Sequence, residues 1–179
     1  MTAKQYIPPE QLIRDSFRLA RTIYDSGFRP DVILVLWRGG TPVGIVIHEF
    51  LLYKGIETFH TVVKAESYTG IERRGEPTVE NLDRVMQAVQ PDSRILVIDD
   101  IFDTGSTLQK VCHALSQITP HVKTATLYVR EGHNESNLEP DYFHSTTDQW
   151  IVFPHELMGL TAEEILRKDP VIHDLVQDG

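Results

Sequence analysis

The stretch from Arg94 to Leu108, RILVIDDIFDTGSTL, constrains the fold of this chain more than any other segment. Its apolar residues 95–98 are followed directly by Asp99 and Asp100. A continuous apolar run is typical of a strand that is covered on both faces of a parallel sheet. Sheets of this kind bind ligands at the carboxyl ends of their strands, so we expect both aspartates to lie at a ligand-binding edge.

The sequence Thr104-Gly105-Ser106-Thr107 follows after a short turn and opens an expected helix. Backbone N–H groups at a helix start, together with hydroxyl groups, bind anions, and a glycine allows the anion to approach closely. Phosphate is the anion that suits such a cradle. The aspartates would repel a phosphate, so they should face sugar hydroxyls or a hard divalent cation. The predicted ligand is therefore a phosphorylated sugar with free hydroxyls.

Charge and composition exclude several classes of partner. The chain has 179 residues, a length that suits one domain, and 26 acidic against 17 basic residues give a net charge of −9. This charge argues against a nucleic-acid partner and against binding to an anionic membrane. The single cysteine, Cys112, excludes a disulfide framework. With no long apolar stretch and no apolar leader, we expect a cytoplasmic protein.

Helical and strand patterns alternate along the first part of the chain, which predicts an α/β fold with a parallel sheet and helices on both faces. The polar segment 66–77 is expected to be a mobile loop. The segment 79–89 fits a helix or a strand about equally well, and a short strand at 84–89 is favoured. The remaining expected elements are helices at 12–27, 43–53 and 105–117, and strands at 31–37, 56–65, 95–98 and 122–129.

The pattern changes after Arg130. Residues 131–145 are polar, 149–154 suggest a short strand, Thr161 opens a helix with a capping box, and Asp169 starts a last helical turn. This tail is too short to be an independent domain. We expect residues 1–145 to form the core and residues 146–179 to form a small hood over the active site, within the same domain.

The central segment resembles a known signature. It lacks both GxxxxGK[ST] and GxGxxG. Instead it resembles the phosphoribosyl pyrophosphate signature of the type I phosphoribosyltransferases, which have a Rossmann-like core. The resemblance implies that Asp99 and Asp100 hold the ribose hydroxyls and the shell of a Mg²⁺ ion, and that Asp103 is the catalytic general base. It also implies that the 5-phosphate is bound by Thr104, Gly105, Ser106 and Thr107.

A second glycine loop, Arg38-Gly39-Gly40, follows the expected strand 31–37. Alone, it would be interpreted as a turn with an exposed arginine. In the purine phosphoribosyltransferases, a similar basic-Gly-Gly loop holds pyrophosphate, often with a cis peptide before the basic residue. The resemblance therefore implies that Arg38 and Gly39 bind pyrophosphate and that the Trp37–Arg38 bond is cis.

Two further segments are similar to parts of this family. Ser67-Tyr68 resembles the flexible loop that closes over the active site, although the pair is a weak signal by itself. The run WIVFPHE resembles the purine-binding segment of xanthine-guanine and hypoxanthine-guanine enzymes, which assigns Trp150 to stacking on the base and Ile151 to a backbone contact. Where the family has a lysine for the purine 6-oxo group this chain has Arg130, and His155 replaces a second tryptophan, so the preferred base stays open.

The histidines give no metal site. His48 and His155 each precede a glutamate, but neither continues to HExxH, which excludes a zinc protease of that type. The others show no ligand spacing and are expected at the surface; they are at positions 60, 113, 121, 133, 144 and 173.

The resemblance implies an enzyme of purine salvage that transfers 5-phosphoribose from phosphoribosyl pyrophosphate to guanine, hypoxanthine or xanthine. The expected products are a nucleoside 5′-monophosphate and pyrophosphate, the expected cofactor is Mg²⁺, and the expected assembly is a homodimer or homotetramer. Two alternatives stay open. One is a non-catalytic regulatory protein that senses a nucleotide on the same fold, and the other is a phosphoribosyltransferase for another base.

Overall fold

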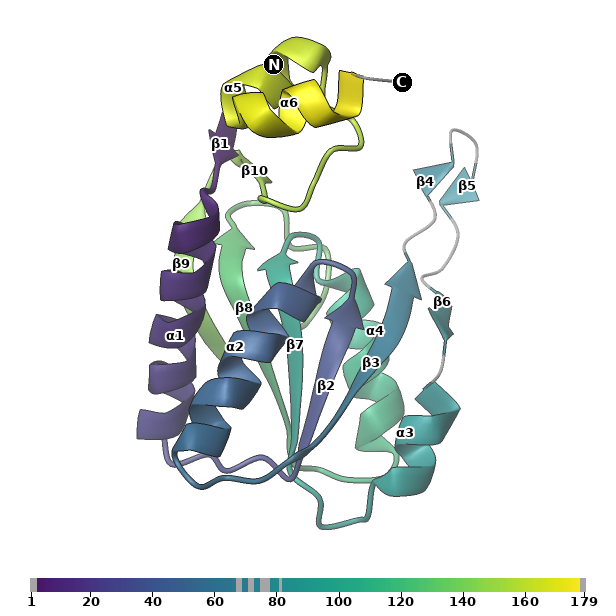
Figure 1. The fold of residues 1–179 in the computed structure, drawn as a ribbon. Coiled ribbons are helices and arrows are strands. Elements are labelled where there is room, and N and C mark those ends of the chain that lie inside the picture. Colours follow the sequence, from purple (N-terminus) through teal and green to yellow (C-terminus); the bar gives the residue numbers. More distant parts are fainter. Residues whose placement is uncertain (1–2, 67–68, 71–72, 75–77, 81, 178–179) are drawn as a thin grey trace. The chain divides into compact units, whose positions relative to one another are not determined.

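The computed structural model describes residues 3–66, 69–70, 73–74, 78–80 and 82–177 (Figure 1). The chain divides into two compact units. The larger unit is Ile13–Asp148, and the smaller unit combines Met1–Leu12 with Gln149–Gly179. The predicted loop residues Ser67 and Tyr68 lie outside the described residues.

The larger unit is built on a six-stranded sheet with the order β6-β3-β2-β7-β8-β9. Neighbouring strands from β3 to β9 are parallel, and the edge strand β6 is antiparallel to β3. The predicted α/β fold with a parallel sheet is thereby confirmed. The strands of this sheet are β2 (Val32–Trp37), β3 (Phe59–Glu66), β6 (Thr78–Glu80), β7 (Ile95–Phe102), β8 (Val122–Arg130) and β9 (Tyr142–Thr147). A separate ribbon pairs β4 (Thr69–Gly70) with β5 (Arg73–Arg74).

Helices pack on both faces of this sheet because alternate strand residues point to opposite sides. Two helices, α3 (Leu82–Ala88) and α4 (Ser106–Ser116), share one apolar cluster with the strands, to which Leu34 and Val97 belong. On the opposite face α2 (Gly40–Tyr53) packs so closely that a Cβ added at Gly44 would lie 2.4 Å from Val35 Cγ2. Beside α2 lies α1 (Pro9–Asp25), whose Phe17 and Tyr24 rings contact Phe50 edge-on.

Two elements differ from the sequence-based expectation. The predicted strand at 84–89 is wrong, because residues 84–88 belong to helix α3. Val89 directly follows the helix and donates its N–H to the Val85 carbonyl at 3.0 Å, and both valines are buried. Spacing of four residues puts both valines on one helix face. The polar segment 131–145 contains most of an additional strand, β9. Its polar sequence YFHSTT suits an edge strand that pairs only with β8 among the described strands.

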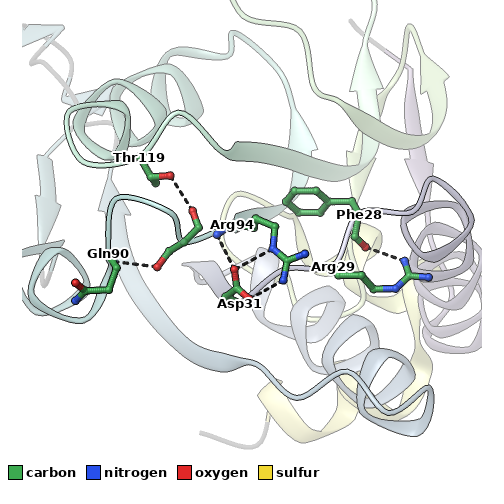
Figure 2. Close-up of polar contacts among 7 residues, drawn as sticks. Phe28, Arg29, Asp31, Gln90, Arg94 and Thr119 are labelled. Atoms are coloured by element: carbon green, nitrogen blue, oxygen red, sulfur yellow. Dashed lines mark hydrogen bonds and ion pairs between the residues drawn. The ribbon is translucent and has the colours of Figure 1, made fainter.

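The amino ends of β2 and β7 are joined by a bidentate ion pair between Asp31 and Arg94, shown in Figure 2. Arg94 donates from Nε and Nη2 to the two carboxylate oxygens at 3.0 and 2.8 Å, and its backbone N–H adds a third bond of 2.9 Å. These bonds lower the pKa of Asp31. Next to this pair, Thr119 donates its hydroxyl proton to the Ser93 carbonyl (Figure 2). This network fixes the end of the sheet that lies opposite the carboxyl ends of the strands.

The smaller unit contains a two-stranded parallel ribbon and two helices. Strand β1 (Lys4–Tyr6) pairs with β10 (Trp150–Val152), and helices α5 (Ala162–Lys168) and α6 (Pro170–Gln177) follow. The predicted capping box at Thr161 is present, and Lys4 forms an ion pair of 2.6 Å with its Glu164. The expected last helical turn is the full helix α6, capped by the Asp169 carboxylate. None of the helices that the structure describes has the length and apolar character to span a membrane.

Candidate active site

The carboxyl ends of β2 and β7 lie side by side in the middle of the sheet (Figure 1). From β2 the chain continues to β3 on one side, whereas from β7 it continues to β8 on the other. Such a reversal of strand order opens a crevice at the carboxyl edge, where open α/β sheets bind their ligands. The loops after β2 and β7 are the two glycine-containing loops that the sequence singles out.

The loop after β2 packs directly on Asp100. A Cβ added at Gly39 would lie 2.0 Å from Asp100 Oδ2, and one added at Gly40 would lie 2.7 Å from the Ile98 carbonyl oxygen. Only glycine therefore fits at position 39 without displacing the carboxylate. The Trp37–Arg38 peptide bond is cis, as the resemblance implies. Arg38 itself is exposed at the start of this loop.

The start of α2 adds to the anion-binding capacity of this loop. Helix α2 begins at Gly40, and Gly39 forms its N-cap without a side-chain hydrogen bond. Backbone N–H groups at a helix start carry partial positive charge, which attracts anions. The Arg38 guanidinium and these N–H groups together form an arrangement suited to phosphate oxygens.

Asp99 and Asp100 lie in the second half of β7, because this strand extends to Phe102 and does not end at Ile98. Asp100 is 8% exposed, and its backbone N–H donates to Asp99 Oδ1 at 3.0 Å. Burial raises the pKa of Asp99 well above its ordinary value, and the neighbouring charge of Asp100 raises it further. Two adjacent carboxylates in this environment are stabilised by a nearby cation or by hydroxyl donors.

These carboxylates have the chemistry that Mg²⁺ requires, because it prefers oxygen ligands. In the described part of the chain, no group of three or more His, Cys, Asp or Glu side chains is arranged to hold a metal. A Mg²⁺ ion at Asp99 and Asp100 would thus depend on oxygens of the substrate and on water for most of its ligands. This arrangement suits an ion that arrives with a phosphorylated substrate.

The loop after β7 forms a compact cradle at the start of α4. Gly105 has a φ angle of +78°, and a Cβ there would lie 2.3 Å from Ser136 Oγ and 2.4 Å from Phe102 Cζ. The hydroxyls of Thr104 and Ser106 lie 2.7 Å apart. Thr104, Ser106 and the following Thr107 are each partly exposed, so their hydroxyls gather at one helix start. This geometry suits the predicted binding of a phosphate.

The predicted general base Asp103 directly follows β7, and the predicted base-binding residue Arg130 ends β8. The register pairs Phe102 with Val129, which brings the next residue of each strand together. Arg130 Nη1 donates to both carboxylate oxygens of Asp103, at 3.3 and 3.4 Å. The Arg130 side chain is 9% exposed and that of Asp103 is 37% exposed. Arg130 thus holds the carboxylate at the edge of the site.

His133, which is expected at the surface from the sequence, also faces Asp103. Its Nδ1 lies 3.8 Å from Asp103 Oδ1, and its side chain is 45% exposed. His133 is therefore both at the surface and beside the predicted general base. No spacing in the sequence indicates this contact, because it depends on how the loop after β8 folds back.

The remaining predicted base-binding residues, Trp150 and Ile151, belong to the smaller unit. Trp150 is 48% exposed at the start of β10, whereas Ile151 is 4% exposed and pairs with Gln5 of β1. His155 stacks on Phe153, with ring centroids 5.6 Å apart and planes at 12°. Position 155 therefore presents an aromatic ring, although it is a histidine and not the tryptophan that the resemblance implies.

Comparisons with known proteins agree with this architecture. The family model described as "Phosphoribosyl transferase domain" matches residues 3–158. A purine phosphoribosyltransferase from Pyrococcus horikoshii is 26% identical, with a TM-score of 0.69 over 88% of this chain and 97% of that chain. No curated protein sequence matches this chain significantly.

Two other solved structures share the fold at lower identity. A xanthine-guanine-hypoxanthine phosphoribosyltransferase from Helicobacter pylori is 19% identical, with a TM-score of 0.65 over 97% of this chain and 99% of that chain. A hypothetical protein from Neisseria gonorrhoeae, solved with bound ppGpp, is also 19% identical. Its TM-score is 0.77 over 96% of this chain and 98% of that chain.

Proposed function

This chain belongs to the phosphoribosyltransferase family, and from that premise we propose that it transfers 5-phosphoribose to a 6-oxopurine. The donor is phosphoribosyl pyrophosphate, and the acceptor is guanine, hypoxanthine or xanthine. The products are a nucleoside 5′-monophosphate and pyrophosphate. The observation that carries this proposal is the close packing of the Arg38-Gly39 loop on Asp100, which puts two anion-binding loops at one sheet edge. Solved relatives described as purine and xanthine-guanine-hypoxanthine enzymes support the choice of purines.

The donor would be held at both of its charged ends. The hydroxyls and N–H groups of Thr104–Thr107 bind the 5-phosphate, and Arg38 with the backbone at Gly39 binds the pyrophosphate. Asp100, which lies against Gly39, accepts hydrogen bonds from the ribose hydroxyls together with Asp99. Holding both ends fixes the ribose C1′ between them, which lowers the entropic cost of reaction.

Mg²⁺ fits the two carboxylates and, when bound, would neutralise charge on the departing pyrophosphate. Asp99 and Asp100 are the residues that would hold it, directly or through ribose hydroxyls. The raised pKa of Asp99 favours this role, because a cation offsets the cost of ionising two adjacent buried carboxylates.

Asp103 would act as the general base. Its carboxylate accepts the proton from the imidazole ring of the purine while a ring nitrogen attacks the ribose C1′. The bond from C1′ to pyrophosphate breaks, and pyrophosphate leaves with the electron pair. Arg130 orients the carboxylate from one side through its two contacts of 3.3 and 3.4 Å.

The two units offer separate candidate groups for recognition of the purine, Arg130 in the larger unit and Trp150 in the smaller one. A guanidinium can donate to the purine 6-oxo group as a lysine does, with a planar set of donors. The half-exposed Trp150 ring offers a face on which a purine can stack, and the backbone of Ile151 can contact an exocyclic group. In this scheme the Arg130 guanidinium donates hydrogen bonds to both Asp103 and the purine. The preference for a base therefore depends on which of its N–H groups remain available to the purine.

The proposal is tested by incubating the protein with phosphoribosyl pyrophosphate, Mg²⁺ and one base at a time. The panel consists of guanine, hypoxanthine, xanthine and adenine, with nucleotide formation followed by chromatography. We expect product with one or more of the three 6-oxopurines and little or none with adenine. Absence of product with all three would contradict the proposal.

A second candidate function is nucleotide sensing without catalysis. The relative from Neisseria gonorrhoeae was solved with ppGpp, a guanosine nucleotide with two diphosphate groups. The two anion-binding loops of this chain offer a place for such groups. Titration of the protein with ppGpp by calorimetry, beside the panel above, separates the two functions. Tight binding of ppGpp without nucleotide formation would favour the sensor.

A further inference from the structure

The loop between β8 and β9, residues 131–141, is attached to the carboxyl edge of the sheet at its start and near its middle. At its start, the Glu131 N–H donates to the Thr147 carbonyl at 2.9 Å. Further along, the Glu135 N–H donates to the Thr104 carbonyl at 3.0 Å, which attaches the loop to the phosphate cradle. His133 lies between these two attachment points. The loop is therefore a structural part of the active-site edge.

The same loop is also stiffened internally. The Asn134 side chain donates to the Leu138 carbonyl at 3.0 Å and accepts from the Ser136 N–H at 2.8 Å. Ser136 Oγ in turn lies 2.3 Å from the position that a Cβ of Gly105 would take. These contacts limit the positions that the backbone of His133 can take. The distance of 3.8 Å between His133 Nδ1 and Asp103 Oδ1 thus reflects a held arrangement.

Asp103 has two basic neighbours of different chemistry, Arg130 and His133. Arg130 contacts it through Nη1, and a guanidinium offers only hydrogen-bond donors, so it can orient the carboxylate but has no site to accept a proton. His133 can accept one, because neutral imidazole has one unprotonated ring nitrogen. Its side chain is 45% exposed, so it also has access to water. Among the described contacts of Asp103, His133 is the partner able to carry a proton to solvent.

We propose that His133 is the proton acceptor that returns Asp103 to its carboxylate form after each transfer, an inference that rests on the proposed function. The purine N–H bond breaks, its electron pair stays on the ring, and the proton bonds to an Asp103 oxygen. The Asp103 O–H bond then breaks, and the proton bonds to Nδ1 of His133. The imidazolium releases a proton to water from its exposed side. No oxidant or further reactant is needed.

The charges around His133 are compatible with this role. Asp103 Oδ1 lies 3.8 Å from His133 Nδ1, and Arg130 Nη1 lies 3.3 Å from the same oxygen. The same loop contains four acidic residues, Glu131, Glu135, Glu139 and Asp141, and Asp141 is paired with Lys123. The nearby negative charges stabilise a transient imidazolium, whereas the charge of Arg130 is already compensated by Asp103.

The test compares the unaltered protein with His133→Gln, which keeps a polar side chain but cannot carry the proton. Single-turnover rates are measured across pH with phosphoribosyl pyrophosphate, Mg²⁺ and the preferred base, because product release often limits steady-state turnover. We expect the single-turnover rate of His133→Gln to be lower than that of the unaltered protein by about 10- to 100-fold. We also expect the rate of His133→Gln to fall less on the acid side than the rate of the unaltered protein, because protonation of a histidine removes its acceptor nitrogen. The matched control is His113→Gln, an exposed histidine in α4, whose rates should be unchanged.

Two readouts separate proton transfer from a structural effect. The affinity for phosphoribosyl pyrophosphate, measured by calorimetry, should differ by less than about twofold between the two proteins. Added imidazole should restore a large part of the rate in His133→Ala, because it can occupy the vacated space and accept the proton. An equal rate in His133→Gln would overturn the inference, and so would a lower rate with an unchanged pH profile and no rescue by imidazole.

The outcome for the unaltered protein distinguishes this inference from the proposed function. Nucleotide formation by the unaltered protein with no effect of His133→Gln rejects only the role of His133. No nucleotide with any purine rejects the proposed function, and the role of His133 with it.

Discussion

The two sides of the active-site edge are built from different parts of the chain. The donor side, Arg38–Gly40 with Thr104–Thr107, consists of glycine loops and helix starts, and its contacts involve mainly backbone. The acceptor side consists of polar side chains, with Arg130 at 3.3 Å and His133 at 3.8 Å from Asp103. The donor side is formed mainly by backbone and tolerates almost no added atoms. On the acceptor side, single side chains can be replaced one at a time. We therefore expect substitutions on the donor side to abolish binding and those on the acceptor side to change rate or base preference.

The largest effect is expected for Gly39→Ala. The added Cβ would lie 2.0 Å from Asp100 Oδ2 and would displace this short side chain from the donor site. Overpacking of this kind costs about 1–3 kcal/mol, and the upper value corresponds to a loss of affinity of about 100-fold. Calorimetric titration with phosphoribosyl pyrophosphate and Mg²⁺ measures it. The control is Gly55→Asn, at a position with positive φ and open space, which should bind normally.

Asp103→Asn should have the next largest effect, and on rate rather than binding. Asparagine keeps the shape of the side chain but cannot accept the purine proton, so turnover should fall by about 100-fold. The affinity for phosphoribosyl pyrophosphate should stay within about twofold, because Asp103 lies on the acceptor side. Steady-state kinetics and calorimetry on the same preparation provide both values. Equal turnover would reject the general-base assignment.

Asp99→Asn should stabilise the unliganded protein at neutral pH. The pKa of Asp99 is raised in the folded protein, so the folded state holds this proton more tightly than the unfolded state does. Ionisation of Asp99 therefore reduces stability as the pH rises from about 4 towards the raised pKa. Asparagine removes this cost, and a gain of about 1 kcal/mol would raise Tm by roughly 2–4 °C. Thermal melts at pH 7 should show the gain and melts below pH 4 should not, with exposed Asp92→Asn as the control. A lower Tm at pH 7 would contradict the argument.

The smallest effect is expected for the chemical modification of Cys112, which lies in α4, the helix that begins at the phosphate cradle. Burial, with the charge of Asp141, raises the pKa of this thiol to about 12. The thiolate is the reactive form, so iodoacetamide at pH 8 should modify Cys112 slowly in the folded protein and readily after denaturation. Mass spectrometry follows the reaction. Rapid modification of the folded protein would show that α4 is packed less tightly than the structure indicates.

The donor side could be predicted from the sequence because its signals are local. Asp99–Thr107 is one continuous motif, and Arg38-Gly39 directly follows an apolar strand. The acceptor side could not be predicted in the same way. The contact between Asp103 and Arg130 joins residues 27 positions apart and depends on the register that pairs Phe102 with Val129. The contact of His133 depends further on backbone bonds that attach its loop to Thr104.

The errors in the fold have the same origin. Residues 84–89 fit both a strand and a helix locally, and the sheet selects the helix by burying Val85 and Val89 together. Strand β9 carries few apolar residues because it lies at an edge, so its pattern resembles that of a polar loop. In both cases a tertiary contact determines the secondary structure, and the local sequence pattern carries no information about that contact.

The central claim, that donor binding and base choice reside on separate sides, is tested most directly with Arg130→Lys. This substitution keeps the positive charge but removes the guanidinium whose Nη1 contacts Asp103. The measurement is the affinity for phosphoribosyl pyrophosphate together with kcat/KM for guanine, hypoxanthine and xanthine. We predict that the affinity for phosphoribosyl pyrophosphate stays within about twofold of that of the unaltered protein, whereas the order of preference among the three bases changes. A large loss of donor affinity with an unchanged order of bases would contradict it.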